Sequence, residues 1–215
     1  MKKIDISKFF LIEDTDLLSI TEKSSLTHNV QKLPFLWSAG STTTKFPYYS
    51  HTLVHRPDGE KIKITDLQYK PNIDSDHFYF YYTIIKKFCL KYKLKFSKVI
   101  RANINSTFFF PNYEYLDPHV DFSEEHLVIL IYLNDVDVIE DKYNSTIVFD
   151  KKINYYEENP LWCYDLDVYK EKIPIKCEIK PKLGKIVCFN GSYYHTNRHP
   201  KPGENRLVCV FNLLI

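Results

Sequence analysis

The stretch LDPHVDFSEEHLVILIYLN, residues 116–134, decides the fold of this chain. It joins an H-x-D motif, His119-Val120-Asp121, to an apolar run at residues 127–133 whose aliphatic content predicts a strand. If the motif is also extended, side chains alternate, so His119 and Asp121 point to one face while Val120 enters apolar packing. Two such side chains on one face need a third ligand from elsewhere in the chain to close a metal site.

One helix and a series of strands are expected around this stretch. Asp74 or Ser75 can cap the helix, whose apolar residues recur at spacings of 3 and 4. That apolar stripe consists of Phe78, Tyr81, Ile85, Phe88 and Tyr92. Strands are predicted at residues 49–55, 99–110, 127–133, 145–149, 173–179, 185–189 and 206–214. A helix packed on a run of antiparallel strands predicts an α+β domain built around a β-sandwich.

Composition and charge narrow the class of protein. The 215 residues are 44% hydrophobic and 26% charged, which is ordinary for a single soluble globular domain. A net charge of +2 offers no footprint for nucleic acid, and the basic stretch at residues 86–98 is interpreted as a solvated helix face. We expect neither a signal peptide nor a membrane-spanning segment, because the basic N-terminus lacks a sustained apolar run and no other apolar run is long enough. Five cysteines without close spacing indicate thiols in a reducing cytosol, so we expect a cytoplasmic protein.

The residues downstream of the H-x-D motif offer a third ligand and a nearby cation. His195 and His199 both follow the expected strand at residues 185–189, and Arg206 opens the last apolar strand. Two histidines and one carboxylate with open positions form the facial triad of non-heme Fe(II) enzymes. An arginine facing inward beside a metal can form a bidentate pair with a carboxylate, whereas an arginine at a strand start can also be a solvated charge.

The order of these motifs resembles the Fe(II)- and 2-oxoglutarate-dependent oxygenases. The similar features are H-x-D, then IYLN at residues 131–134, then PKLGKIVCFNGSYYH at 181–195, and finally a proline and an arginine before the terminal strand. The resemblance covers residues 97–215 and is greatest to the prolyl-hydroxylase-like branch and to small stand-alone members from bacteria and phages. It implies an α+β fold with a double-stranded β-helix core, also called jelly-roll or cupin-like, and flanking helices.

The resemblance also implies how the chain is organised. A single oxygenase domain would span residues 1–215, with N-terminal helices and a supporting strand in residues 1–96. The catalytic jelly-roll core would occupy residues 97–215. An acidic and aromatic insertion at about 150–175 interrupts that core. The insertion is interpreted either as a lid or substrate wall, or as a surface excursion packed on the sandwich; its aromatic residues are Tyr155, Tyr156, Trp162 and Tyr164.

By position, the resemblance implies that His119, Asp121 and His195 bind Fe(II). His199 is the rival third ligand. His195 is favoured because its spacings to Pro200 and to the arginine of the last strand match the family.

The co-substrate contacts follow from the resemblance in the same way. Arg206 would pair with the distal carboxylate of 2-oxoglutarate, and Tyr132 would donate a hydrogen bond to it. Asn103 and Asn105 alternate with Ile104 on the strand before the motif, so one face of that strand is polar. Family members place a co-substrate contact on this strand, and either asparagine is a candidate.

Three other histidines need an interpretation. His126 follows the motif at the start of a strand and is expected to be a surface residue or a neighbour of the ligands. His51 and His55 lie on one face of an early strand. Both are expected to be structural, although that face also suits the mouth of a pocket.

The resemblance implies a dioxygenase that couples oxidative decarboxylation of 2-oxoglutarate by O2 to hydroxylation of a primary substrate. A peptidyl prolyl group and a small molecule are both candidate substrates, and fold-level similarity cannot choose between them. Two other classes remain open. A cupin-type metal dioxygenase would use no 2-oxoglutarate, and a non-catalytic jelly-roll binding module would need no triad.

Overall fold

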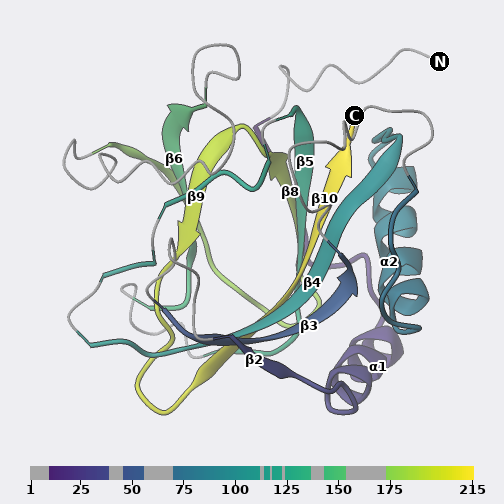
Figure 1. Cartoon of the computed structure of the whole chain (residues 1–215), viewed down its shortest axis with the longest axis horizontal. Coiled ribbons are helices and arrows are strands. Elements are labelled where there is room, and N and C mark those ends of the chain that lie inside the picture. The colour runs from purple at the N-terminus through teal and green to yellow at the C-terminus, as the bar shows by residue number, and fades with distance from the viewer. Residues whose placement is uncertain are drawn as a thin grey trace.

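The computed structural model describes residues 10–38, 46–55, 70–111, 114–116, 118–122, 124–136, 143–153 and 173–215. Within these ranges the chain forms two helices and ten strands (Figure 1). The helices are α1 (Ile20–Val30) and α2 (Phe78–Lys91). The strands are β1 (Leu11–Asp14), β2 (Leu36–Ser38), β3 (Tyr48–Val54), β4 (Lys98–Phe108), β5 (His126–Tyr132), β6 (Thr146–Lys152), β7 (Ile175–Ile179), β8 (Ile186–Asn190), β9 (Tyr193–Asn197) and β10 (Asn205–Leu214).

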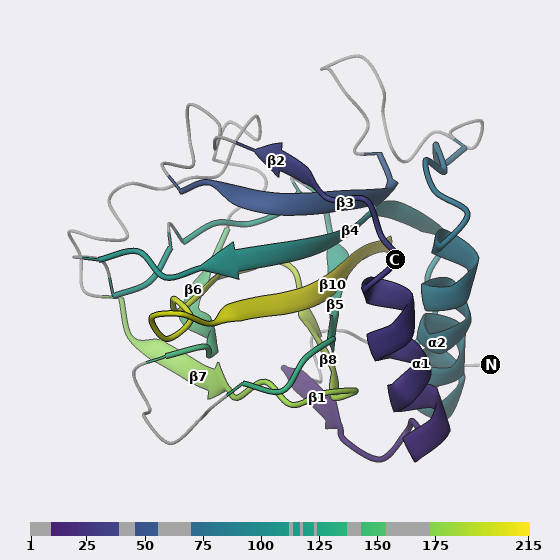
Figure 2. The same ribbon diagram turned by 90° about the horizontal axis from the view of Figure 1, so that it is seen from below.

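Two antiparallel sheets face each other and form the expected jelly roll. The larger sheet has seven strands in the order β1-β8-β5-β10-β4-β3-β2, and the smaller has three in the order β7-β6-β9. Several neighbouring strands are distant in sequence: β5, for example, pairs with β8 and β10 rather than with β4 or β6. Figure 2 shows β2, β3, β4 and β10 following one another across the large sheet. This topology places the start of β10 and the middle of β9 on either side of the space between the two sheets.

Strand alternation divides the core into two layers. On β5, Ile129 and Ile131 pack in the cluster that contains the helices, whereas Leu130 and Tyr132 pack with Val148 of the smaller sheet. Every residue of β5 is buried, which explains why its sequence is continuously apolar. The large sheet therefore packs against the helices on its outer face and against the smaller sheet on its inner face. A site between the two sheets would lie against that inner face.

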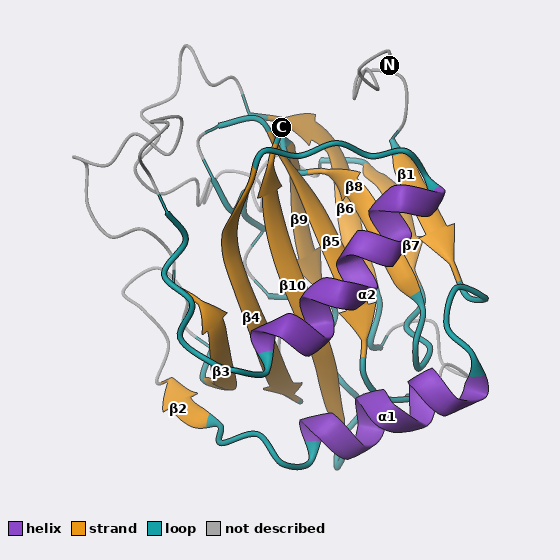
Figure 3. Ribbon diagram, turned by 90° about the vertical axis from the view of Figure 1, so that its right-hand side faces the viewer, coloured by secondary structure: helices purple, strands orange, loops and turns teal. Residues whose placement is uncertain are grey.

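Both helices lie on the outer face of the large sheet (Figure 3). The apolar stripe predicted for α2 is buried at Phe78, Tyr81, Ile85 and Phe88. The predicted cap is wrong. The N-cap is His77, which makes no side-chain cap bond. Ser75 lies two residues before this N-cap, where its hydroxyl oxygen accepts from the His77 amide at 3.3 Å and its hydroxyl donates to His51 Nε2 at 2.9 Å.

The residue pattern did not locate helix α1, although the resemblance implied N-terminal helices in residues 1–96. The helix begins with a capping box. The amide of Ser19 donates to Glu22 Oε2 at 2.8 Å, and the amide of Glu22 donates to Ser19 Oγ at 3.2 Å. Lys87 of α2 donates to Glu22 Oε1 at 2.7 Å, so this carboxylate also joins the two helices. These contacts lower the pKa of Glu22 from 4.5 to about 2, with the Lys87 bond as the largest cause.

Replacing Glu22 with alanine is expected to lower the free energy of unfolding by about 1 kcal/mol through loss of the cap. The Glu22→Gln variant keeps an acceptor for the Ser19 amide but loses the charge. Because the folded pKa is depressed, the stabilisation by the Glu22 charge is present above pH 4.5 and is lost as the pH falls toward 2. Urea unfolding at pH 7 and near pH 2 measures both effects. A wild type and a Glu22→Gln variant with parallel pH profiles would contradict the charge contribution.

The predicted strands are all present, with ends shifted by at most three residues. Strands β1, β2 and β9 were not expected. The predicted insertion at 150–175 falls largely at residues 154–172, which lie outside the described residues.

Two findings bear on the class of protein. No helix in the described part of the chain is long and apolar enough to cross a membrane. Cys89, Cys177, Cys188 and Cys209 are free thiols, and Cys163 lies outside the described residues.

Candidate metal centre

Three side chains from two distant segments converge between the sheets. His119, Asp121 and His195 each offer a ligand atom, and these atoms all lie within 4.8 Å of one another. His195 Nε2 is 3.4 Å from Asp121 Oδ2, and His119 Nε2 is 3.9 Å from Asp121 Oδ1. The structure thus brings together the three residues that the sequence motif singled out, and the group can hold a metal ion.

A pair of backbone hydrogen bonds sets this geometry. The amide of His119 donates to the carbonyl of His195, and the amide of His195 donates to the carbonyl of His119, each at 2.9 Å. The expectation that the H-x-D motif lies on a strand is wrong, because His119 forms an isolated antiparallel bridge and Asp121 lies in a bend. The alternation still holds. Val120 is buried in a cluster with Ile147 and Tyr194, so its two neighbours face the other way.

The ring of His195 is oriented by a backbone acceptor. Its Nδ1–H donates to the carbonyl of Tyr193, 3.0 Å away. A carbonyl only accepts, so Nδ1 carries a proton, and Nε2 is the ring atom that faces Asp121. The edge of Phe189 packs against the same ring with centroids 5.1 Å apart. A backbone bond of this kind is the usual orienting contact of a metal-binding histidine.

Asp121 is held by two donors that the sequence analysis missed. Asn212 Nδ2 donates to Oδ2 at 2.8 Å, and Arg101 Nη1 donates to Oδ1 at 3.3 Å. Burial by itself would raise the pKa of Asp121, but the hydrogen bond and charge of His195, with the charges of Arg101 and His119, hold it well below its usual range. The carboxylate is therefore ionised and fixed in orientation, as a metal ligand must be.

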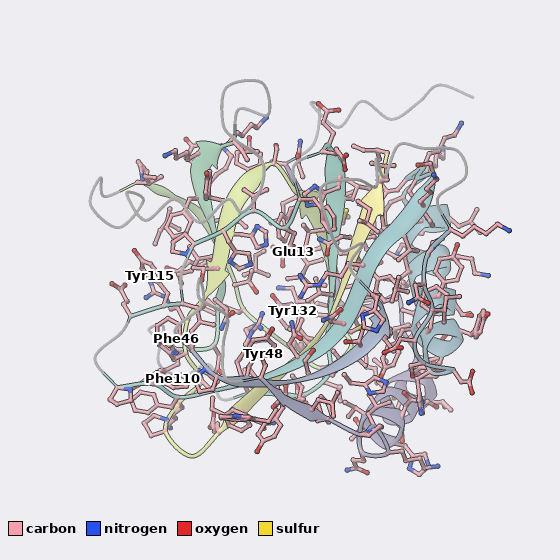
Figure 4. All side chains as sticks on the ribbon, viewed as in Figure 1. Glu13, Phe46, Tyr48, Phe110, Tyr115 and Tyr132 are labelled. Carbon is pink, nitrogen blue, oxygen red and sulfur yellow. The ribbon has the colours of Figure 1, made fainter. Side chains whose placement is uncertain are left out.

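A second cluster lies deeper between the sheets, around a buried cation. Arg206 is 3% exposed, and its Nη2 atom donates to the Thr146 hydroxyl at 2.7 Å. Tyr132, which points into the interior (Figure 4), has its hydroxyl 2.7 Å from the same Thr146 oxygen. The guanidinium of Arg206 lies 5.4 Å from the Tyr132 ring centroid.

Arg206 has no acidic partner among the described residues, and its buried Nε atom has no hydrogen-bond partner there. Burial lowers the pKa of Arg206, but an arginine stays protonated in proteins. A buried positive charge bonded only to neutral groups is costly unless an anion joins it. The cluster of Arg206, Tyr132 and Thr146 thus has the chemistry of an anion pocket.

The two asparagines lie on the polar inner face of β4, as the alternation predicted. Ser50 Oγ donates to Asn105 Oδ1 at 3.0 Å, and Asn103 Nδ2 donates to Ser50 Oγ at 3.3 Å. Both asparagines are partly exposed, whereas Ile104 between them is buried against the helices.

The other histidines occupy different environments. His199 is buried between Phe46 and Phe110, with ring centroids 5.6 and 5.8 Å away, and does not belong to the group of three. Burial lowers the pKa of His199. His126 is fully buried, so its expected surface position is wrong. His51 is structural: its Nδ1–H donates to the Pro34 carbonyl at 2.8 Å.

Comparison with solved structures supports the expected fold. No protein-family model and no curated protein sequence matches this chain. Among solved structures, it is similar to a 2OG-Fe(II) oxygenase family oxidoreductase from Burkholderia pseudomallei, with a TM-score of 0.63 and 11% identity over 97% of this chain and 87% of that chain.

Two further structures are similar over nearly the whole chain. A prolyl-4-hydroxylase from Pseudomonas putida gives a TM-score of 0.55 at 10% identity, covering 98% of this chain and 96% of that one. HygX from Streptomyces hygroscopicus, solved with nickel and 2-oxoglutarate bound, gives 0.56 at 12% identity, covering 97% and 84%. The chain therefore has the double-stranded β-helix fold of the 2-oxoglutarate oxygenases.

Proposed function

We propose that this chain is an Fe(II)- and 2-oxoglutarate-dependent dioxygenase that hydroxylates a primary substrate. One observation carries the proposal: a buried arginine that has no anionic partner among the described residues lies in the same interior as a His-Asp-His group. The metal group by itself suits many reactions. The combination with Arg206 is specific to an enzyme whose co-substrate is an anion.

The donor set fits Fe(II). His119, Asp121 and His195 supply two imidazole nitrogens and one carboxylate, the facial triad that leaves positions open for other ligands. Nε2 of His195 faces Asp121, and Asn212 restrains the carboxylate by a hydrogen bond to Oδ2. In this proposal the three side chains bind the metal.

The anion pocket fits the distal carboxylate of 2-oxoglutarate. Arg206 can form a bidentate charge-assisted pair with a carboxylate, and the hydroxyls of Tyr132 and Thr146 can donate to the same group. Asn103 and Asn105 remain candidate contacts to the co-substrate on β4. Thr146 was not predicted, and it joins the two residues that were.

When bound, Fe(II) would activate O2, which would oxidise 2-oxoglutarate to succinate and CO2 with one oxygen atom and hydroxylate the primary substrate with the other. The protein's own residues orient both groups and keep the reaction in a dry interior lined by Val128, Leu130 and Phe189. A cupin-type dioxygenase without 2-oxoglutarate, or a non-catalytic binding module, would leave Arg206 buried without an anion. A peptidyl prolyl group and a small molecule are both candidate substrates of the proposed reaction.

The test is anaerobic addition of 2-oxoglutarate to the Fe(II)-loaded protein. We expect a visible charge-transfer band, followed by slow succinate release when O2 is admitted. The His119→Ala variant should lose both signals, while His28→Ala, which removes an exposed histidine of α1, should keep them. A wild-type protein with no band, or a band that survives His119→Ala, would contradict the proposal.

Replacing Thr146 with valine is expected to weaken 2-oxoglutarate binding by about tenfold. The change removes one hydroxyl that bonds both Tyr132 and Arg206, which is worth about 1–1.5 kcal/mol. Calorimetric titration of 2-oxoglutarate into the Ni(II)-loaded protein measures the affinity. The Thr83→Val control removes a hydroxyl on α2 and should bind normally. Equal affinities for Thr146→Val and wild type would remove Thr146 from the pocket.

A further inference from the structure

A polar row on β4 runs beside the metal centre. Arg101, Asn103 and Asn105 alternate with Ala102 and Ile104, which are buried on the helix side. The three polar residues are partly exposed on the inner face of the sheet. This wall is therefore open to a ligand near the triad, and it is distinct from the apolar wall formed by β5 and β8.

Arg101 brings a positive charge to the metal centre that the proposed function does not use. Its Nη1 atom is 3.3 Å from Asp121 Oδ1, and its side chain is 18% exposed. Fe(II), Asp121, dianionic 2-oxoglutarate and Arg206 together carry no net formal charge. Counted with these groups of the described residues, Arg101 adds one positive charge beside the metal, and a partly desolvated positive charge favours binding of an anion.

Arg101 is not required to orient Asp121. Asn212 already holds Asp121 Oδ2 with a shorter bond of 2.8 Å, and Asn212 is fully buried. The Arg101 contact is longer and falls on the other oxygen. The guanidinium can accordingly turn to a ligand without releasing the carboxylate from its buried donor.

The neighbouring side chain adds a hydrogen-bond acceptor. Asn103 Oδ1 is buried and has no partner among the described residues. Two linked hydrogen bonds orient the side-chain amide of Asn103. Its Nδ2 donates to Ser50 Oγ, and the Ser50 hydroxyl donates to Asn105 Oδ1. A group that binds here must donate a proton to Asn103 Oδ1, as an ammonium group does.

We propose that the primary substrate is a small carboxylic acid with a donor next to its carboxylate, the chemistry of a free amino acid. Arg101 binds the carboxylate, and Asn103 accepts from the adjacent ammonium group. This inference rests on the proposed dioxygenase function and narrows its substrate. An internal peptidyl prolyl group, which has neither a free carboxylate nor an ammonium group, does not match the row.

The test uses calorimetry on the Ni(II)-loaded protein with 2-oxoglutarate. The titrants are the proteinogenic L-amino acids and the corresponding L-amino acid amides, which lack the carboxylate charge. We expect at least one acid to bind the wild type, and its amide to bind about tenfold or more weakly. Arg101→Gln should weaken the acid by about tenfold or more, and Arg101→Lys should retain part of the affinity. Lys95→Gln, an exposed charge removed just before β4, should bind the acid normally.

The outcomes separate the two proposals. Binding of Ni(II) and 2-oxoglutarate is titrated first, and its failure in the wild type would overturn the dioxygenase function together with this inference. If both bind but no acid does, or an acid and its amide bind equally, only the substrate inference is overturned. An acid that simply coordinates the metal would bind Arg101→Gln as well as wild type, and that result also overturns it. If Arg101→Gln does not fold, Arg101→Lys and the acid-amide comparison still decide.

Discussion

Replacing Arg206 with methionine is expected to lower the affinity for 2-oxoglutarate by about 100-fold or more and to stabilise the unliganded protein. The affinity falls because loss of one partner of a desolvated charge pair costs about 2–5 kcal/mol. The stability rises because methionine has a similar length without a buried charge, and Thr146 keeps its bond to Tyr132. We expect a gain of about 1 kcal/mol, which raises the melting temperature by about 2–4 °C for a chain of this size.

Arg198 provides the matched control. Its exposed fraction of 8% is similar to the 3% of Arg206. Unlike Arg206, it is paired with Glu178 at 2.7 Å and with Glu114 at 2.6 Å. Arg198→Met leaves Glu178 without its partner and should destabilise the protein. Calorimetry of 2-oxoglutarate binding and thermal melts of the unliganded proteins measure both effects. Melting shifts of the same sign in the two variants would contradict an anion pocket at Arg206.

Replacing Asp121 with alanine is expected to lower metal affinity by more than about 100-fold. Changes to residues that merely support metal ligands cost about 10–100-fold, and Asp121 is itself the anionic member of the group. Its loss also leaves the positive charge of Arg101 beside the site without the carboxylate that it contacts. Titration of Ni(II) into the metal-free protein, followed by calorimetry, gives the affinity.

The control for this change is Asp150→Ala. Asp150 is an exposed carboxylate on β6 that pairs with Lys176, away from the triad. It should bind Ni(II) as the wild type does. A Ni(II) affinity within threefold of wild type for Asp121→Ala would remove this residue from the metal centre.

Strand positions were predictable because the core strands of this fold are local runs of apolar residues. Strand β5 reads as seven buried residues, and β10 as ten residues of mainly apolar character, so their existence follows from short windows of sequence. The position of helix α1 was missed because the helix buries only Leu26 and Val30, too few residues to form an apolar stripe. Strands β1 and β2 are too short to carry a periodic pattern.

The supporting residues of the candidate site were not predictable in this way. Asn212 and Asp121 are 91 residues apart in sequence, and Arg206 and Thr146 are 60 apart, so no local pattern joins them. One signal was available: Asn212 interrupts the apolar run of the last strand, and Thr146 stands at the start of another buried apolar run. A buried polar group in such a run needs a partner, and both partners are site residues.

The proposed metal would link two remote parts of the chain that the mutual amide bonds between His119 and His195 already hold together. One ligand precedes β5 and the other lies on β9, so separating these backbones pulls the ligands apart. Metal release and local opening of this bridge then become one event. Ni(II) binding should slow hydrogen exchange at these two amides by the factor by which the metal stabilises the closed bridge. The exchange rates of the two amides then report whether the metal is bound.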